Sequence, residues 1–197
     1  MLPLGAETGA VRVTRLLKDY SGPFDPEFSH AKLERETLLE ILRENSDYLR
    51  RLDGQWYVTV MQMCGNDVAF ECDVKIWEKF ILYELKATTD LLNIHGDDVV
   101  TVVKAMQATP WMWIHDRTFE LKDQGHAVIT YRNCPTQVYL ENEGSGREKQ
   151  ICHVLERRLF EMTAHYFNPR IEVTALKLPP REKGSSISCQ WEFKLER

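Results

Sequence analysis

The sequence predicts an α+β protein: N-terminal helices followed by a β-β-α-β-β unit whose antiparallel sheet is covered by helices. Apolar residues recur with a helical period from residue 29 to residue 109, and alternating apolar and polar residues take over after Pro110, interrupted by one more helical stretch. With 197 residues, 43% of them hydrophobic, the chain can form one domain with a substantial core. We therefore divide it into an N-terminal arm (1–28), a helical region (29–109) and an α+β region (110–197) packed with the helices as one domain.

The helical region follows an arm in which glycine and proline recur too often for a long element. Ser29 is a suitable N-cap for a helix whose apolar residues continue at helical spacing to Leu52. Asp53-Gly54 is predicted to break or kink this helix, because glycine weakens a helix interior. A second short helix is then expected to extend to Gly65.

Two further helices complete this region. The longer one is expected over residues 67–95, with Gly96 at the C′ position where helices commonly end. Asp97-Asp98 then caps a shorter helix, and Pro110 closes it because proline cannot continue a helix.

A β-hairpin is predicted directly after Pro110. Residues 111–121 and 127–131 carry the apolar residues of two extended runs. The polar turn between them contains Gly125, which adopts a positive φ at low cost.

The rest of the α+β region supplies a helix and two more strands. Apolar residues at helical spacing predict a helix over residues 147–167, which Asn168-Pro169 ends. The last strands are expected over residues 171–175 and 187–195, and the second of them alternates strictly between apolar and polar side chains.

Charge and motifs exclude several classes of partner and enzyme. Lys and Arg total 25 against 30 Asp and Glu, so the net charge of -5 gives nucleic acid no broad electrostatic reason to bind. No apolar run approaches the ~20 residues of a membrane span and no signal-peptide pattern occurs, which predicts a cytoplasmic protein without a membrane partner. Nucleotide-binding glycine loops, serine-hydrolase elbows and His-Glu-x-x-His zinc motifs are also lacking.

The cysteines are the first candidate functional group. Their odd number, five, and their wide spacing indicate free thiols in a reducing compartment. Cys134 lies where a strand ends and a turn or short helix begins, so helix-terminal amides are expected to favour its thiolate. Cys152 and Cys189 lie on the apolar faces of the predicted 147–167 helix and the last strand.

These three sulfurs are expected to reach one pocket between helix and sheet. Three roles stay open for Cys134, Cys152 and Cys189: core packing, ligation of a metal ion or cofactor, and nucleophilic or redox chemistry. The identity of any cofactor stays unknown, with a cysteine-bound metal ion as the candidate.

Aromatic residues are the second candidate group, because they are numerous enough to line an apolar cavity. His115 shares side-chain parity with two tryptophans of the predicted first strand, and His153 is expected to face solvent. Asp53, Asp116 and Arg132 are polar groups that can orient a ligand. The predicted ligand-binding residues are Trp56, Trp113, His115, Tyr131 and Trp191.

Several short motifs resemble those of a known family. They are Asp53-Gly54-Gln55-Trp56, the stretch from Gly65 to Trp77 with Asp73, Asn133-Cys134-Pro135, Cys152, Asn168-Pro169, and Cys189-Gln190-Trp191-Glu192-Phe193. Over about residues 45–195 the chain resembles an uncharacterised prokaryotic family, bacterial and archaeal, similar to L-2-amino-thiazoline-4-carboxylate hydrolase-like proteins and more distantly to vinyl-reductase-type small-molecule-binding domains.

The resemblance implies an α+β ligand-binding fold with a cysteine-bearing pocket, and it places Cys134, Cys152 and Cys189 at the family's three cysteine positions. The histidine that typically precedes Asp-Gly in the family is Leu52 here. Any metal-binding or proton-transfer role of that histidine is therefore lost from this chain.

Three functions follow as expectations. The first is a small-molecule-binding module, with or without a metal or cofactor held by the three cysteines. The second is a hydrolase for a cyclic, thiazoline-like C–N bond, in which Cys134 is the nucleophile or a metal ligand, and His115 or Asp53 transfers the proton. The third is a structural homo-oligomer that associates through the predicted 67–95 helix.

Overall fold

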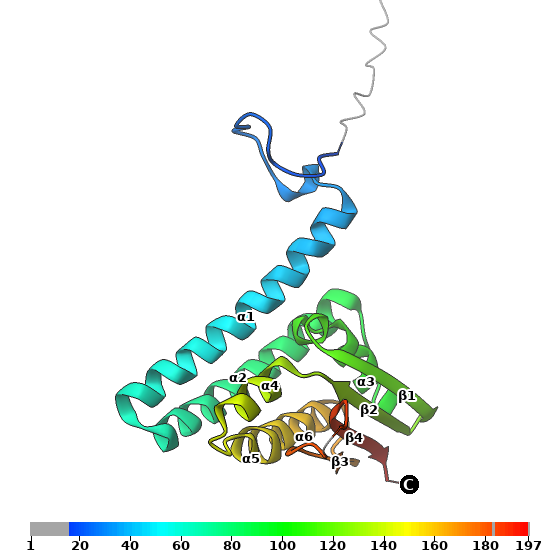
Figure 1. Ribbon diagram of the computed structural model, residues 1–197. Coiled ribbons are helices and arrows are strands. Elements are labelled where there is room, and N and C mark those ends of the chain that lie inside the picture. The colour runs from blue at the N-terminus through cyan, green and yellow to red at the C-terminus, as the bar shows by residue number, and fades with distance from the viewer. Residues whose placement is uncertain (1–15, 183, 197) are drawn as a thin grey trace, which may run out of the picture. The chain divides into compact units, whose positions relative to one another are not determined.

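The computed structural model describes residues 16–182 and 184–196 (Figure 1), and residues 1–15 of the predicted arm lie outside this part. The chain divides into two compact units, with the boundary between Glu44 and Asn45. The elements confirm the predicted fold class, because helices come first and a four-stranded antiparallel sheet follows.

The first unit, as described from Leu16, contains a parallel bridge between Leu17 and Leu33. Ser29 has extended backbone and precedes a short 3-10 helix, η1 (His30–Lys32), and the α-helix α1 begins only at Arg35. The prediction that the helix starts at Ser29 is therefore wrong.

The helix α1 (Arg35–Cys64) is continuous for 30 residues, so the predicted break at Asp53-Gly54 is wrong. One glycine costs a helix only about 1 kcal/mol relative to alanine, too little to interrupt an otherwise regular helix. Gly65, with a φ of 88°, makes the turn into α2 (Asn66–Leu92). That helix ends before Gly96, because Asn93 adopts the left-handed conformation and donates its N–H to Thr89.

The helix α3 (Val99–Ala108) begins as predicted, since the Asp98 side chain accepts a hydrogen bond from the Thr101 N–H at 2.8 Å. The segment after it does not form a strand. Pro110 instead starts a 3-10 helix, η2 (Pro110–Trp113), because proline fits the first position of a helix. The hairpin strands are β1 (Asp116–Asp123) and β2 (His126–Arg132), so Trp111, Trp113 and His115 all precede the sheet.

The C-terminal helical segment is built from several pieces. The helix α4 (Pro135–Glu143) follows β2, and the predicted 147–167 helix is divided into α5 (Glu148–Gln150), the π-helix η3 (Ile151–Leu155) and α6 (Glu156–Phe167). The chain leaves α6 at Asn168-Pro169 as predicted.

The sheet has the order β1-β2-β4-β3, and every pair is antiparallel. The last two strands are β3 (Ile171–Lys177) and β4 (Ile187–Leu195). Trp191 of β4 lies opposite Ile129 of β2 and Ala175 of β3, so the predicted apolar face of the last strand is at the centre of the sheet.

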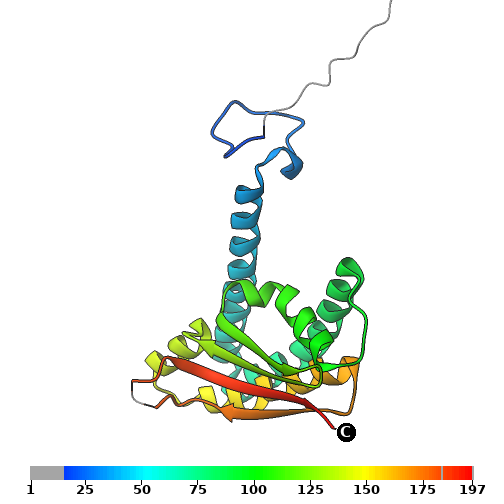
Figure 2. The same cartoon turned by 90° about the vertical axis from the view of Figure 1, so that its right-hand side faces the viewer.

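Helices cover one face of this sheet (Figure 2), and α3 and α6 make the contacts with it. Fully buried Phe193 and Trp191 pack there with Val102 of α3 and Ala164 of α6. The helix α2 packs in turn on α6 and α3. Within residues 16–182 and 184–196, the helices lack the combination of length and apolar character that crossing a membrane requires.

Candidate functional site

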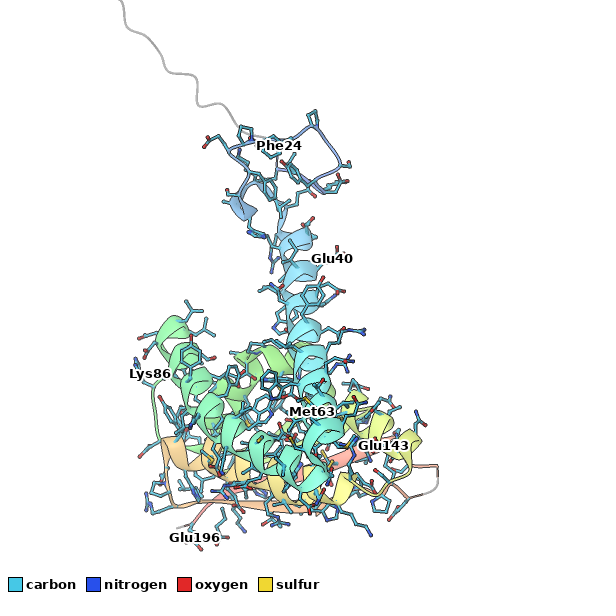
Figure 3. The ribbon with its side chains drawn as sticks, turned by 90° about the vertical axis from the view of Figure 1, so that its left-hand side faces the viewer. Phe24, Glu40, Met63, Lys86, Glu143 and Glu196 are labelled. Atoms are coloured by element: carbon cyan, nitrogen blue, oxygen red, sulfur yellow. The ribbon has the colours of Figure 1, made fainter. Side chains whose placement is uncertain are left out.

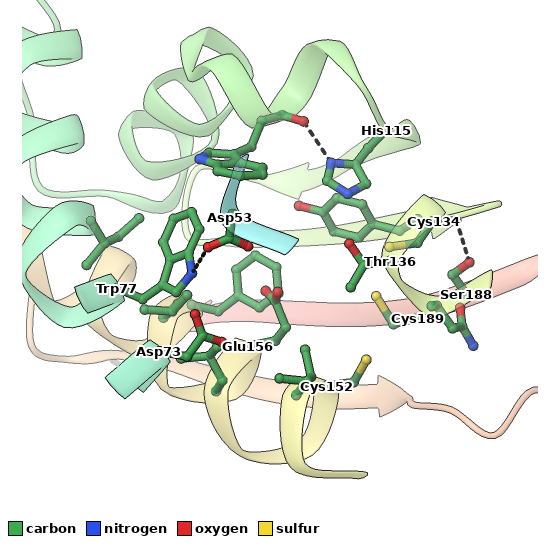
Figure 4. Close-up of a pocket in the computed structure, with 18 of the residues that line it drawn as sticks. Asp53, Asp73, Trp77, His115, Cys134, Thr136, Cys152, Glu156, Ser188 and Cys189 are labelled. Carbon is green, nitrogen blue, oxygen red and sulfur yellow. Dashed lines mark hydrogen bonds between the residues drawn. The ribbon is translucent and has the colours of Figure 1, made fainter. Parts of the chain in front are cut away.

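A cavity of about 210 Å³ lies in the second unit, between its helices and strands β2 and β4 (Figure 4). Residues of α1, α2, α4 and α6 line it together with η2, η3 and the two central strands. Because these elements are far apart in the sequence, the cavity exists only once the helices have docked on the sheet.

Three carboxyl groups from three helices line the cavity: Asp53 of α1, Asp73 of α2 and Glu156 of α6. Burial raises the pKa of Asp53 to about 6, and the pKa values of Asp73 and Glu156 each to about 7. The charge of Asp53 contributes to the raised pKa of both neighbours. At pH 7, Asp73 and Glu156 are therefore only partly ionised, and Asp53 keeps its proton to a higher pH than an exposed carboxyl group does.

The aromatic wall beside these acids is formed by Trp77 and Trp111. The Trp77 Nε1–H donates a hydrogen bond to Asp53 Oδ1 at 3.2 Å (Figure 4). Its ring meets that of Trp111 edge to face, with 4.8 Å between the ring centroids. The edge of one indole ring and a carboxyl group thus lie side by side.

Four side chains of the lining have a buried polar atom without a hydrogen-bond partner among the described residues: the Nε1–H donors of Trp111 and Trp191, and one oxygen each of Glu84 and Gln137. Glu84 is 6% exposed and Gln137 is 1% exposed, and within the described residues neither Oε1 atom has a hydrogen-bond partner. The Gln137 amide nitrogen donates to Glu141 at 2.9 Å, which identifies the orphaned atom as the acceptor oxygen. Burial raises the pKa of Glu84 to about 7.

The three predicted cysteines all line this cavity, on the side away from Trp77 (Figure 4). Cys134 is the residue before α4, and its backbone N–H donates to Ser188 Oγ at 2.9 Å. The prediction of a helix-stabilised thiolate is wrong: burial raises the pKa of Cys134 and outweighs the hydrogen bonds from the backbone amides of Gln137 and Thr136.

The other two thiols are also held in the protonated form. Burial raises the pKa of Cys189 to about 12 and raises that of Cys152 further. Metal ligation needs thiolates, and among the described residues no group of three or more His, Cys, Asp or Glu side chains is arranged to hold one metal ion. The arrangement therefore does not fit the predicted metal site at Cys134, Cys152 and Cys189.

Cys152 lies in the π-helix η3, and Glu156 begins α6 one turn later. Both residues line the cavity. Single π turns within helices are frequent at functional sites, because the extra residue per turn re-aims neighbouring side chains. The sequence predicts an uninterrupted helix here and gives no sign of the turn.

His115 lines the cavity as predicted, although it lies between η2 and β1 and not on a strand. Its Nδ1 is 2.7 Å from the Trp111 carbonyl oxygen, which can only accept, so Nδ1 carries the proton. The ring packs edge-on against Tyr131 at a centroid distance of 5.5 Å. Burial lowers the pKa of His115, which leaves a neutral ring with an unprotonated Nε2.

Two of the predicted ligand-binding residues do not reach the cavity. Trp56 and Trp113 are 59% and 37% exposed and do not contribute to the lining, whereas Tyr131 and Trp191 do. Trp111 lines the cavity where Trp113 was predicted to do so, because the segment forms the 3-10 helix η2 and not a strand.

Of the polar residues predicted to orient a ligand, one lines the cavity and two do not. Asp53 lines the cavity, but Asp116 and Arg132 do not. His153, expected in solvent, is half-buried, with its Nε2 2.5 Å from the Pro179 carbonyl oxygen.

Arg147 is the one Lys or Arg among the described residues that lines the cavity. Its guanidinium group binds both carboxylate oxygens of Glu143, labelled in Figure 3, at 2.6 Å each. It also lies 5.0 Å from the ring centroid of Tyr57. The positive charge of Arg147 is thus already neutralised within the wall.

The fold and cavity define an α+β protein with a helix-covered antiparallel sheet and a pocket lined by carboxyl, thiol and aromatic side chains. The chain belongs to the family of unknown function DUF6125, whose model matches residues 31–195. Comparisons with curated proteins and with solved structures each found no match.

Proposed function

We propose that the protein is a small-molecule-binding module and that its ligand occupies the cavity between the helices and strands β2 and β4. One observation carries the proposal: buried polar atoms with unused hydrogen-bonding capacity and aromatic side chains line the same cavity. Buried polar groups in folded proteins are almost always satisfied, and leaving one unsatisfied costs about 1–3 kcal/mol. The unpartnered oxygens of Glu84 and Gln137 are explained if a ligand supplies their partners.

The size of the cavity limits the ligand. An apolar cavity of ~150 Å³ accommodates benzene. The volume of about 210 Å³ here therefore suits a compound with one ring and a short polar substituent.

Gly54 offers a direct test, because it lines the cavity and a Cβ atom added there meets nothing within 4 Å. Because Gly54 is exposed as well as part of the lining, Gly54→Leu places a bulky side chain at the solvent-facing edge of the cavity without breaking α1. Gly54→Ala is the matched control that adds one carbon. We expect at least one of phenol, benzylamine and benzoate to bind the wild-type protein and Gly54→Ala in calorimetric titrations. Binding should weaken at least tenfold in Gly54→Leu.

Thermal melting of both variants establishes that they fold. The proposal fails if none of the three probes binds the wild-type protein. It also fails if folded Gly54→Leu binds them as tightly as Gly54→Ala does.

A second candidate, hydrolysis of a cyclic C–N bond by Cys134, is favoured by the unprotonated Nε2 of His115. That atom is a potential general base, and the amides at the start of α4 can stabilise a thiolate once it forms. The raised pKa of Cys134 opposes this candidate in the ligand-free protein.

Alkylation by iodoacetamide separates the two candidates, with exposed Cys64 as an internal reference. An activated Cys134 must react faster than Cys64 below pH 7, and this advantage must disappear in His115→Ala. A binding module without a cysteine nucleophile shows the reverse order, with Cys64 modified first.

A further inference from the structure

We propose that the cavity selects a cation: a protonated amine or amidine on a ring-sized apolar body, held between the carboxyl groups of Asp53, Asp73 and Glu156 and the rings of Trp77 and Trp111. This inference rests on the proposed binding function and specifies its ligand class.

The first argument is the number of acceptor oxygens in the lining. Among the described residues, the Oε1 atoms of Glu84 and Gln137 receive no hydrogen bond, and Asp53 receives only the indole N–H of Trp77. The Nε1–H donors of Trp111 and Trp191 are unpartnered as well, so the lining also offers two donors. An ammonium group has three donors and no acceptor and complements the carboxyl oxygens beside Trp77, whereas a carboxylate or phosphate would place more acceptors next to them.

The second argument is charge. Four carboxyl groups, those of Asp53, Asp73, Glu84 and Glu156, line the cavity, and none forms an ion pair within residues 16–182 and 184–196. Arg147 is already bound to Glu143. A buried carboxyl group either keeps its proton or needs an opposite charge, and a bound cation would supply that charge.

The third argument is the aromatic wall. Cations bind over the face of tryptophan more strongly than over any other ring, within about 6 Å of the centroid. The hydrogen bond from Trp77 to Asp53 holds an indole next to a carboxylate, so one positive group can contact both.

Binding of a cation must also displace protons. Burial raises the pKa of Asp73 and Glu156 to about 7, and a positive charge within about 4–6 Å would lower both values. The neutral His115 ring faces the cavity from the segment before β1. Two more carboxyl groups of the cavity titrate in this range, because burial raises the pKa of Glu84 to about 7 and that of Asp53 to about 6. The phenol and thiol groups of the cavity stay protonated at neutral pH: Tyr57, Tyr131, Cys134, Cys152 and Cys189.

The test compares benzylamine with benzyl alcohol, which has a similar size but no charge. We expect benzylamine to bind at least tenfold more tightly at pH 7.5. At pH 6.5, calorimetry in two buffers of different ionisation enthalpy should show a fraction of a proton released per benzylamine bound, and none for benzyl alcohol.

Variants assign the effect to the carboxyl groups. Asp73→Asn and Glu156→Gln, examined separately in case one misfolds, should each weaken benzylamine binding at least tenfold and leave benzyl alcohol unaffected. Glu71→Gln removes an exposed acid of the same helix α2 outside the cavity and should change neither affinity.

Two results would overturn the inference in distinguishable ways. Equal or tighter binding of benzyl alcohol, or benzylamine binding without proton release, contradicts the cation preference and leaves the binding function intact. Failure of phenol, benzoate, benzylamine and benzyl alcohol alike removes the binding function and the inference together.

Discussion

Trp77 of α2 donates its indole N–H to the carboxylate of Asp53 on α1 at 3.2 Å, which joins the two helices at the wall of the cavity. The two residues are 24 positions apart, and both line the cavity. A buried carboxylate needs donors, and this bond partly offsets the effect of burial on the pKa of Asp53.

Trp77→Phe keeps an aromatic ring and removes the donor. We expect the pKa of Asp53 to rise above its value of about 6, because the hydrogen bond lowers it and burial raises it. Carbon-13 NMR of the Asp53 carboxyl group measures the titration directly. Trp113→Phe, outside the cavity, should leave that titration unchanged, and an unshifted Asp53 pKa in Trp77→Phe would contradict the assigned hydrogen bond.

Asp73→Asn tests the electrostatic description through stability. The pKa of Asp73 is about 7 in the folded state against 3.8 for the free side chain, so the native state holds a proton that the unfolded state loses between these values. Wild-type stability contributed by this group is present below about pH 4 and is lost as the pH rises through 7. Asn cannot ionise, so the free energy of unfolding of Asp73→Asn should increase relative to that of the wild-type protein as the pH rises.

At about 1.4 kcal/mol per pKa unit, this relative gain is at most on the order of 4 kcal/mol at pH 8. Urea unfolding at pH 5 and pH 8 measures the part of this gain that falls between those values, on the order of 3 kcal/mol. Glu71→Gln serves as the exposed control on the same helix and should show no comparable gain. A constant stability difference between Asp73→Asn and wild type at both pH values would show that Asp73 titrates normally.

Gly54→Ala should stabilise the protein by up to ~1 kcal/mol, because Gly54 lies inside α1 and its added Cβ meets open space. Gly96→Ala should instead destabilise the protein, because Gly96 has a φ of 139° and an added Cβ would lie 2.3 Å from Thr101 Oγ1. Chemical unfolding of both variants is the measurement. Destabilisation by Gly54→Ala would mean that α1 is not regular at this position.

Much of the fold follows from local patterns in the sequence. The alternation from Ile187 to Leu195 predicts β4 and its buried face, and Asp98 predicts the start of α3. The errors at Gly54 and Pro110 have local causes: Gly54 does not stop a long helix, and Pro110 starts a helical turn where apolar residues suggested a strand.

The site was less predictable than the fold. Cys134, Cys152 and Cys189 were expected to meet because each lies on a face toward the pocket, and they do line one cavity. The carboxyl cluster was missed because Asp73 and Glu156 resemble ordinary polar residues of amphipathic helices. Their convergence depends on how α2 and α6 pack, which no local pattern encodes.

The most direct test of the binding claim is to observe the five tryptophan indole N–H signals by nitrogen-15 NMR during a titration with benzylamine. Trp77, Trp111 and Trp191 line the cavity, and Trp56 and Trp113 serve as internal controls outside it. We predict saturable shifts for the three cavity tryptophans and none for the two controls. Shifts confined to Trp56 and Trp113, or no saturable shift at all, would contradict the assignment of this cavity as the binding site.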